Sequence, residues 1–209
     1  MNWEQLRMYL KRTAVDDRGD YYYSLYHLAI LLPKHSLIVE IGCHRGDSTL
    51  CLALGAKETE SHVITIDPVF QTGTITVADE HHRLGNSYIA SLSDMMDRFL
   101  MCSLITQVTV IPEYSHHVLP LWPNDLPIDL LVVDGEHTYT AIQRDCLWLE
   151  KIRVGGHAAF DDWFHEIELS VKDYVKEKPE WTFLHESTQG HRPDGFNLTY
   201  LRKIINDLL

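Results

Sequence analysis

Several apolar runs of this 209-residue sequence end in carboxylates. The acids are Glu40 in LIVEIG, Asp67 in VITIDP, Asp134 in LLVVDG, and Asp161 and Asp162 in AAFDDW. Clustered carboxylates repel one another unless a cation or the donor groups of a ligand compensate their charge. The acids are therefore typical of a site that holds a metal ion or a polar ligand. Helix capping explains a single acid of this kind, such as Asp162, but it explains the whole set poorly.

A second feature with chemical meaning is the pair of glycines, Gly42 and Gly46, that follows the first acid. Dinucleotide-binding enzymes need a third glycine between them, because the backbone must approach a pyrophosphate closely. Here His44 stands in that middle position, which disfavours a pyrophosphate. Asp67 lies twenty-one residues after Gly46, close to the offset of roughly 20 residues at which an acid reaches a ribose hydroxyl. The pattern favours a ligand with a ribose but no phosphate.

The segments around these residues alternate between strand and helix patterns. Short β-branched runs predict strands at residues 36–41, 62–67, 107–112, 128–134 and 157–160. Helical spacing predicts helices between them at 47–57, 87–102, 115–121 and 138–152, and before them at 2–12 and 21–32. This rhythm indicates a parallel sheet covered on both faces. The acids then lie at one edge of the sheet, outside the carboxyl ends of the strands, where such folds bind ligands.

The rhythm changes near the end of the chain. A helix is predicted at 163–177, and two strands at 181–186 and 196–202 have only a turn between them, which predicts an antiparallel hairpin. The predicted fold is therefore an α/β, Rossmann-like domain with a seven-stranded, mostly parallel sheet and helices on both faces. We expect one domain over 1–209, with N-terminal helices in 1–34 and the core in 35–209. The long polar segment 69–86 is predicted to be a substrate lid.

Charge, apolar run length and cysteine spacing indicate which partners and which cellular compartment to expect. The formal net charge of −12 disfavours a nucleic-acid partner, because phosphate binding needs a basic face. The longest apolar runs are too short to cross a bilayer, so we expect no membrane partner. The four cysteines are scattered without a CxxC pair, and the first residues lack a signal-peptide pattern. A cytoplasmic protein is expected.

Four segments together resemble a known family: VEIGCHRGDST, VITIDP, IDLLVVDGEHTYTAIQRD and VGGHAAFDDW. They resemble class I S-adenosylmethionine-dependent methyltransferases, and more narrowly the group that contains the macrocin-type sugar O-methyltransferases and the cephalosporin-hydroxylase-like proteins. The resemblance runs from about Leu37 to Trp163. It implies the class I methyltransferase fold and S-adenosylmethionine as cofactor. It also implies a small hydroxylated molecule, such as a sugar or a specialised metabolite, as methyl acceptor.

The resemblance also implies roles for individual residues. The positions that match cofactor contacts are Glu40, Gly42, Gly46, Ser48, Asp67 and Ser115. Within this set, Asp67 corresponds to the acid on the ribose and Ser115 lies near the adenine contact. The positions that match divalent-metal ligands are Asp134, Asp161 and Asp162. His137 matches a proposed base, and Asp134 is counted with it as catalytic.

The chemistry implied for these residues is methyl transfer to a hydroxyl. Three carboxylates suit Mg²⁺ or Mn²⁺, which would lower the pKa of an acceptor hydroxyl and fix its direction. His137 is then expected to take the proton, because the unperturbed pKa of histidine lies near neutral pH. Asp161 and Asp162 would hold the metal together with Asp134.

Other interpretations stay open. The chain can be a class I methyltransferase that acts on a nitrogen or a protein acceptor without metal, or a nucleotide-binding module or NAD enzyme on the same fold. His137 can simply begin a helix, and the tyrosines at 21–23 and 26 can pack between helices, although they can also cover the cofactor. The histidine pairs at 81–82 and 116–117 are not expected to bind metal, since adjacent side chains point apart. A homodimer through the apolar N-terminal helices is possible.

Overall fold

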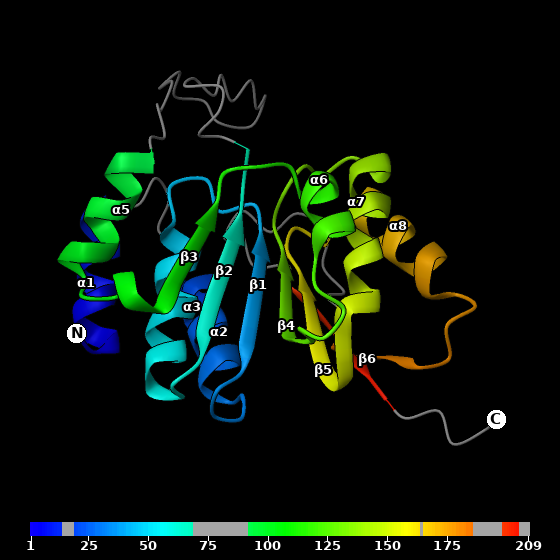
Figure 1. The fold of residues 1–209 in the computed structure, drawn as a ribbon, viewed down its shortest axis with the longest axis horizontal. Helices are drawn as coiled ribbons and strands as arrows, with labels where there is room; N and C mark the ends of the chain where they lie inside the picture. Colours follow the sequence, from blue (N-terminus) through cyan, green and yellow to red (C-terminus); the bar gives the residue numbers. More distant parts are fainter. Residues whose placement is uncertain (14–18, 69–91, 164, 186–197, 205–209) are drawn as a thin grey trace.

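The structure is a computed structural model that describes residues 1–13, 19–68, 92–163, 165–185 and 198–204. Within them, seven strands form one sheet in the order β3-β2-β1-β4-β5-β7-β6 (Figure 1). The strands are β1 Leu37–Ile41, β2 His62–Ile66, β3 Val108–Ile111, β4 Ile128–Val133, β5 Ile152–Phe160, β6 Trp181–His185 and β7 Thr199–Lys203. The first five pair in parallel, and β7 is antiparallel to both β5 and β6. The predicted sheet and its terminal antiparallel hairpin are confirmed.

Helices cover both faces of the sheet, as predicted (Figure 1). One face carries α1 Trp3–Thr13, α2 Gly19–Ile30, α3 Asp47–Glu58 and α5 Leu92–Met101. The other carries α6 Ser115–Val118, α7 Tyr139–Cys146 and α8 His165–Val175, with the short 3-10 turns η2 Leu119–Leu121 and η3 Leu147–Lys151. A further 3-10 turn, η1 Ile105–Gln107, leads into β3.

Two buried cores result from the alternation of side chains along the strands. Ile38 and Leu130 face the core under α2 and α3, while Val39 and Leu131, one residue later, face the core under α7 and α8. All four side chains are fully buried. The central strands are therefore apolar on both faces, as expected for a parallel sheet sandwiched between helices.

The segment before Phe160 differs from its prediction. The predicted helix at 138–152 ends as α7 at Cys146 and continues as η3, and β5 begins at Ile152 rather than at 157. The pairing of β5 with β4 shifts between Ile128 and Leu130, next to Gly155, whose φ is +83°. Glycines are depleted in strands and mark irregular pairing. Because Gly155 and Gly156 lie inside β5, the sequence pattern did not predict the first half of this strand.

One other expectation differs at its boundary, and one is not tested. The helix predicted from 163 begins as α8 at His165, so Asp162 is not the residue directly before it. The segment 69–86, predicted as a lid, lies outside the described residues. Among the described helices, none combines the length and apolarity needed to span a bilayer.

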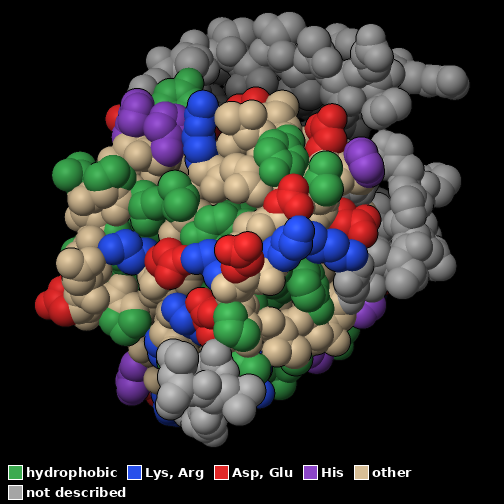
Figure 2. Space-filling view, turned by 90° about the vertical axis from the view of Figure 1, so that its right-hand side faces the viewer, with side chains coloured by type: hydrophobic (Ala, Val, Ile, Leu, Met, Phe, Trp, Pro, Cys, Tyr) green, Lys and Arg blue, Asp and Glu red, His purple; other side chains and the backbone are tan. Residues whose placement is uncertain are grey.

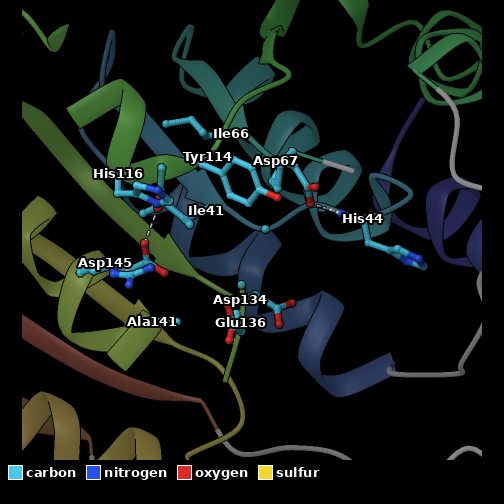
Figure 3. A pocket seen from close by; sticks show the side chains of 15 residues that line it. Ile41, His44, Ile66, Asp67, Tyr114, His116, Asp134, Glu136, Ala141 and Asp145 are labelled. Atoms are coloured by element: carbon cyan, nitrogen blue, oxygen red, sulfur yellow. Dashed lines mark hydrogen bonds between the residues drawn. The ribbon is translucent and has the colours of Figure 1, made fainter. Parts of the chain in front are cut away.

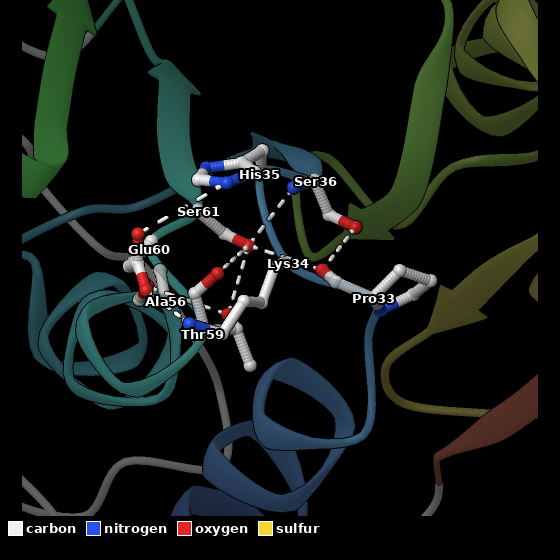
Figure 4. A network of polar contacts seen from close by, with 8 residues as sticks. All are labelled: Pro33, Lys34, His35, Ser36, Ala56, Thr59, Glu60 and Ser61. Carbon is white, nitrogen blue, oxygen red and sulfur yellow. Dashed lines mark hydrogen bonds and ion pairs between the residues drawn. The ribbon is translucent and has the colours of Figure 1, made fainter.

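A polar network closes the N-terminal edge of the sheet, where β1 and β2 begin (Figure 4). The Ser61 hydroxyl accepts from the Ser36 amide at 3.0 Å and from the Thr59 hydroxyl at 2.8 Å. Ser36 in turn donates to the Pro33 carbonyl at 2.7 Å. These bonds tie the loop after α2 to the loop after α3, which fixes this edge and leaves the opposite edge to carry the site.

The predicted acids do lie side by side at the C-terminal edge. Main-chain hydrogen bonds continue the ladder one residue beyond the strands: Asp67 to Ile111, Asp134 to Ile41 and Asp161 to Val133. β1 and β4 are neighbours at the middle of the sheet. The strands from β1 to β3 are added toward one side of the sheet, and those from β4 onward toward the other side, so the strand order reverses between β1 and β4. Ligands of open α/β sheets bind at such a point.

Candidate active site

A pocket of about 490 Å³ opens at this edge of the sheet (Figure 3). Its walls come from the C-terminal ends of β1 and β2, from the residues that follow β1, β2, β3 and β4, and from α7. In Figure 3, Asp67 and Asp145 lie on opposite sides of the pocket, with Asp134 and Glu136 below the Tyr114 ring. Of the predicted cofactor residues, Gly42, Asp67 and Ser115 line the pocket, and so does the predicted catalytic Asp134.

The loop after β1 forms one wall and has an unusual backbone. Gly42, His44 and Gly46 have φ values of +85°, +47° and +80°, which is the left-handed region. A Cβ on Gly42 would lie 2.1 Å from the Asp134 carbonyl oxygen, so only glycine lets the loop press against the end of β4. A Cβ on Gly46 would lie 2.8 Å from Cγ of Met95. The two glycines therefore serve close packing as well as the turn.

Asp67 holds this loop from the pocket side. Its Oδ2 accepts the amides of Cys43 at 2.7 Å and His44 at 2.8 Å, and the side chain is 4% exposed. In a pyrophosphate-binding loop, such amides face the ligand. Here a carboxylate of the chain itself takes them, which gives a physical reason why a histidine can replace the middle glycine.

Three of the predicted cofactor residues lie behind the pocket wall rather than on it: Glu40, Gly46 and Ser48. Glu40 is fully buried and accepts the Thr49 hydroxyl at 2.5 Å. Burial raises its pKa to about 7 and the charge of Asp134 adds to this, against the nearby hydroxyls of Ser48, Thr49 and Thr65. In this arrangement the three residues shape the loop, and direct contact with a cofactor stays a prediction for them.

The sequence reasoning missed Asp145, which lines the pocket from α7. Ser115 donates to its Oδ1 at 2.5 Å, and only 5% of the residue is exposed. Burial raises the pKa of Asp145 to about 6, although the bond from Ser115 lowers it. A signal was present, since Asp145 shares the helical stripe of Ile142, Cys146 and Leu149, all buried and apolar. A charge on such a stripe indicates a polar partner.

Asp134 and His137 form the centre of a chain of polar contacts that runs from Tyr21 to Asp162. The Tyr21 hydroxyl, from buried α2, donates to Oδ2 of Asp134 at 2.8 Å. His137 places Nε2 at 3.6 Å from Oδ1 of Asp134 and Nδ1 at 3.2 Å from Oδ2 of Asp162. The tyrosine thus packs between helices, as one reading of the sequence had it, and also reaches the site.

The two carboxylates change the acid–base behaviour of His137. Burial lowers its pKa, but the bonds to Asp134 and Asp162 and their charges outweigh this and raise the pKa to about 10. The pKa of His137 therefore differs from the near-neutral value expected from the sequence. His137 is a cation at neutral pH here, and its role as a base stays a prediction.

The predicted metal ligands do not form a ready metal site in this arrangement. The His137 ring stands between the carboxylates of Asp134 and Asp162, while Asp161 is 1% exposed. Within the part of the chain that the structure describes, no three His, Cys, Asp or Glu side chains are grouped so as to hold a metal ion. The residues present therefore do not fit Mg²⁺ as they stand.

With this geometry established, the sequence can be compared with known families. Residues 39–163 match a family described as a methyltransferase domain. The match covers more than half of the chain and contains the glycine loop, Asp67, Asp134, His137 and Asp162. The chain belongs to this methyltransferase family. The prediction of an S-adenosylmethionine-dependent methyltransferase is confirmed.

Solved structures with the same fold include several O-methyltransferases. The O-methyltransferase TomG from Streptomyces achromogenes, solved with S-adenosylmethionine, has a TM-score of 0.65 at 16% identity, covering 96% of this chain and 88% of its own. A Bacillus cereus O-methyltransferase, solved with S-adenosylhomocysteine, has a TM-score of 0.64 at 17% identity, with the same coverages. An rRNA methylase from Streptococcus thermophilus has a TM-score of 0.60 at 16% identity, covering 92% and 100%. At these identities the likeness establishes the class I fold.

The pocket of this methyltransferase has an acidic wall. Among the described residues that line it, the carboxylates are Asp67, Asp134, Glu136 and Asp145, and the guanidinium is that of Arg144. An excess of negative charge in a partly enclosed site favours cationic ligands. The wall is therefore suited to a ligand that carries positive charge.

Proposed function

We propose that this methyltransferase transfers the methyl group of S-adenosylmethionine to a hydroxyl of a small molecule. The observation that carries the proposal is one pocket that joins the Gly42 loop, Asp67, Ser115 and Asp134. In the proposal Asp67 binds the ribose, Ser115 lies at the adenine and Gly42 lies beside the methionine part. The acceptor hydroxyl enters at Asp134. The acidic wall matches the positive sulfonium of the cofactor.

S-Adenosylmethionine supplies an activated methyl group, so the protein mainly has to align an acceptor with it. The acceptor oxygen forms a bond to the methyl carbon as the carbon–sulfur bond breaks, and the sulfur keeps that electron pair as a thioether. Asp134 takes the hydroxyl proton, because it lines the pocket with its Oδ2 oriented by Tyr21. The His137 ring, with Nε2 at 3.6 Å from Oδ1, forms an ion pair with the same carboxylate.

Small-molecule O-methylation has more support than a nucleic-acid or protein acceptor. TomG and the Bacillus cereus protein are O-methyltransferases by their descriptions. The net charge of −12 works against phosphate backbones. On the face drawn in Figure 2, acidic and basic side chains are interspersed rather than gathered by sign. A sugar or a specialised metabolite is the acceptor class that we propose, and a homodimer stays a prediction.

Metal dependence is a separate part of the hypothesis. Asp134, Asp161 and Asp162 are the residues that would hold Mg²⁺ or Mn²⁺, and the ion would acidify the acceptor hydroxyl. The described side chains do not provide a three-ligand set without movement of His137. The steps proposed above therefore involve the protein's own groups.

The test is calorimetric titration of S-adenosylhomocysteine into the full chain, in Mg²⁺ and in chelator, with NAD as control ligand. We expect S-adenosylhomocysteine to bind and NAD not to bind. The variant Asp67→Asn should weaken binding about tenfold, since it removes a charged acceptor from the loop and the ribose. Asp129→Asn is the matched control, because Asp129 likewise accepts a backbone amide, that of Leu37 at 2.7 Å.

Each arm has a clear meaning. Loss of binding in Asp67→Asn with normal binding in Asp129→Asn supports the cofactor site. No S-adenosylhomocysteine binding in either buffer would contradict the proposed function. A Mg²⁺ signal that disappears in Asp161→Ala would support metal-assisted transfer, whereas unchanged methyl transfer in chelator would exclude it.

A further inference from the structure

Arg98 contacts the glycine loop at groups that Asp67 does not bind. Its Nη1 donates to the Arg45 carbonyl at 2.6 Å, and its Nη2 forms an ion pair with the Asp47 carboxylate. Its Nε donates to the Tyr9 hydroxyl of α1 at 3.3 Å, and the guanidinium lies 5.7 Å from the centre of that ring. Arg98 is only 8% exposed, so these bonds form away from bulk water.

One negatively charged side chain, Asp67, and one positively charged side chain, Arg98, thus bind the loop. The Asp67 carboxylate takes the amides of Cys43 and His44, and the Arg98 guanidinium takes the carbonyl of Arg45 and the side chain of Asp47. A non-glycine residue at positive φ, such as His44, is strained and persists only where its surroundings impose it.

The helix that carries Arg98 also sets the space for the turn. Met95 and Phe99 lie one turn apart on α5 around Arg98, and both would meet a Cβ placed on Gly46, at 2.8 and 3.0 Å. Cys43 is in contact with Met95 as well, with 3.9 Å between the two sulfur atoms. Helix α5 therefore contacts the glycine loop through Met95, Arg98 and Phe99.

We propose that Arg98 is a positioning residue for the cofactor: it fixes the glycine loop in the conformation that accepts S-adenosylmethionine. The inference rests on the proposed cofactor site. Without the guanidinium, the carbonyl of Arg45 and the carboxylate of Asp47 lose their shared donor. The free energy needed to order the loop then reduces the free energy of cofactor binding. Arg98 does not line the pocket, so its effect reaches the cofactor only through the loop.

The chain provides a matched control at the other edge of the sheet. Arg153 forms an ion pair with Asp129, which also accepts the amide of Leu37. This pair has the same chemistry, an arginine on an aspartate that is tied to the backbone, but neither residue lines the pocket or contacts the glycine loop. The Arg153 side chain is 38% exposed and that of Arg98 is 9% exposed, so the stability of each variant is measured separately, while a loss of cofactor affinity should be confined to Arg98→Met.

The experiment is calorimetric titration of S-adenosylhomocysteine into the full chain carrying Arg98→Met, Arg98→Lys or Arg153→Met, with thermal unfolding of each variant. We expect Arg98→Met to weaken binding about tenfold, the effect of one charge-assisted hydrogen bond. Arg98→Lys should recover part of it, because an ammonium can pair with Asp47 but cannot also bind the Arg45 carbonyl in a fork. Arg153→Met should bind like the wild type.

The outcomes separate this inference from the function on which it rests. Wild-type affinity in Arg98→Met, or equal weakening in Arg153→Met, overturns the positioning role while leaving the cofactor site intact. No binding by the wild type overturns the proposed cofactor site and this inference together. If Arg98→Met does not fold, the affinities of Arg98→Lys and Asp47→Asn for S-adenosylhomocysteine test the same proposal. The first variant changes only the geometry of the ion pair, and the second removes only its negative charge.

Discussion

Among single residues, Glu40 shows how burial changes the proton affinity of a carboxylate. Its side chain is fully buried under the glycine loop, with the Thr49 hydroxyl as donor. Burial raises its pKa to about 7, from an ordinary value of 4.5. The folded protein therefore binds this proton more tightly than the unfolded chain does, which links the charge of Glu40 to stability.

The substitution Glu40→Gln should make the protein more stable at alkaline pH. Because the folded pKa is raised, the wild type loses free energy of unfolding as the pH rises from about 4.5 to about 7. A neutral glutamine removes that loss, so the variant should gain on the order of 3 kcal/mol at pH 8 and nothing below pH 4.5. Urea denaturation at several pH values measures the difference. A constant difference across this range would contradict the assignment.

At the scale of elements, the turn from β1 into α3 is the part of the fold most sensitive to shape. Gly42 has a φ of +85° and touches the Asp134 carbonyl, so it joins the end of β1 to the end of β4. Gly155, inside β5, has nearly the same φ of +83°, but the nearest atom to an added Cβ is Arg153 Nη1 at 4.0 Å. An added Cβ would therefore cause backbone strain at both glycines, but a steric clash only at Gly42.

The pair Gly42→Ala and Gly155→Ala tests that separation. Gly155→Ala should cost about 1–2 kcal/mol of unfolding free energy, the strain of a left-handed backbone with a Cβ. Gly42→Ala should cost ~4 kcal/mol or more and abolish S-adenosylhomocysteine binding, because the new methyl group meets main-chain atoms that cannot move aside. Urea denaturation and calorimetry give both quantities. Equal effects of the two substitutions would show that contact with Asp134 is unimportant.

At the scale of the whole molecule, one sheet separates two apolar cores. Leu54 on α3 belongs to the core that includes α1 and α2, and Leu149 on η3 belongs to the core on the opposite face. The N-terminal helices are part of the first core, as Leu6 and Leu25 are fully buried in it. Because the same strands supply both cores, we expect them to unfold together as one domain.

The substitutions Leu54→Ala and Leu149→Ala test this expectation. Each should lower the free energy of unfolding by ~2–5 kcal/mol, the usual cost of emptying a buried leucine site. In both variants, urea transitions followed by tryptophan fluorescence and by far-ultraviolet circular dichroism should coincide. Trp122 and Trp148 report the second core, where their rings are 5.0 Å apart. Separate transitions in Leu54→Ala would mean that the N-terminal helices unfold independently.

The sequence by itself determined the sheet, its direction and the edge at which the acids gather. These features follow from local periodicity, since apolar runs bounded by glycine and aspartate specify buried parallel strands and the turns after them. The acids Asp67, Asp134 and Asp161 accordingly stand at the C-terminal ends of β2, β4 and β5 in one sheet. Local patterns predicted the start of β5 poorly, because glycines interrupt this strand and the residues before it continue a helical pattern.

Only the tertiary structure decided which of these residues face the pocket and how they are charged. The decisive contacts join distant segments, as between Tyr21 and Asp134, 113 residues apart, and between Arg98 and Arg45, 53 residues apart. His137 becomes a cation because two strand ends place carboxylates on either side of it. Burial and charge depend on neighbours in space, and a periodic pattern along the chain carries no record of them.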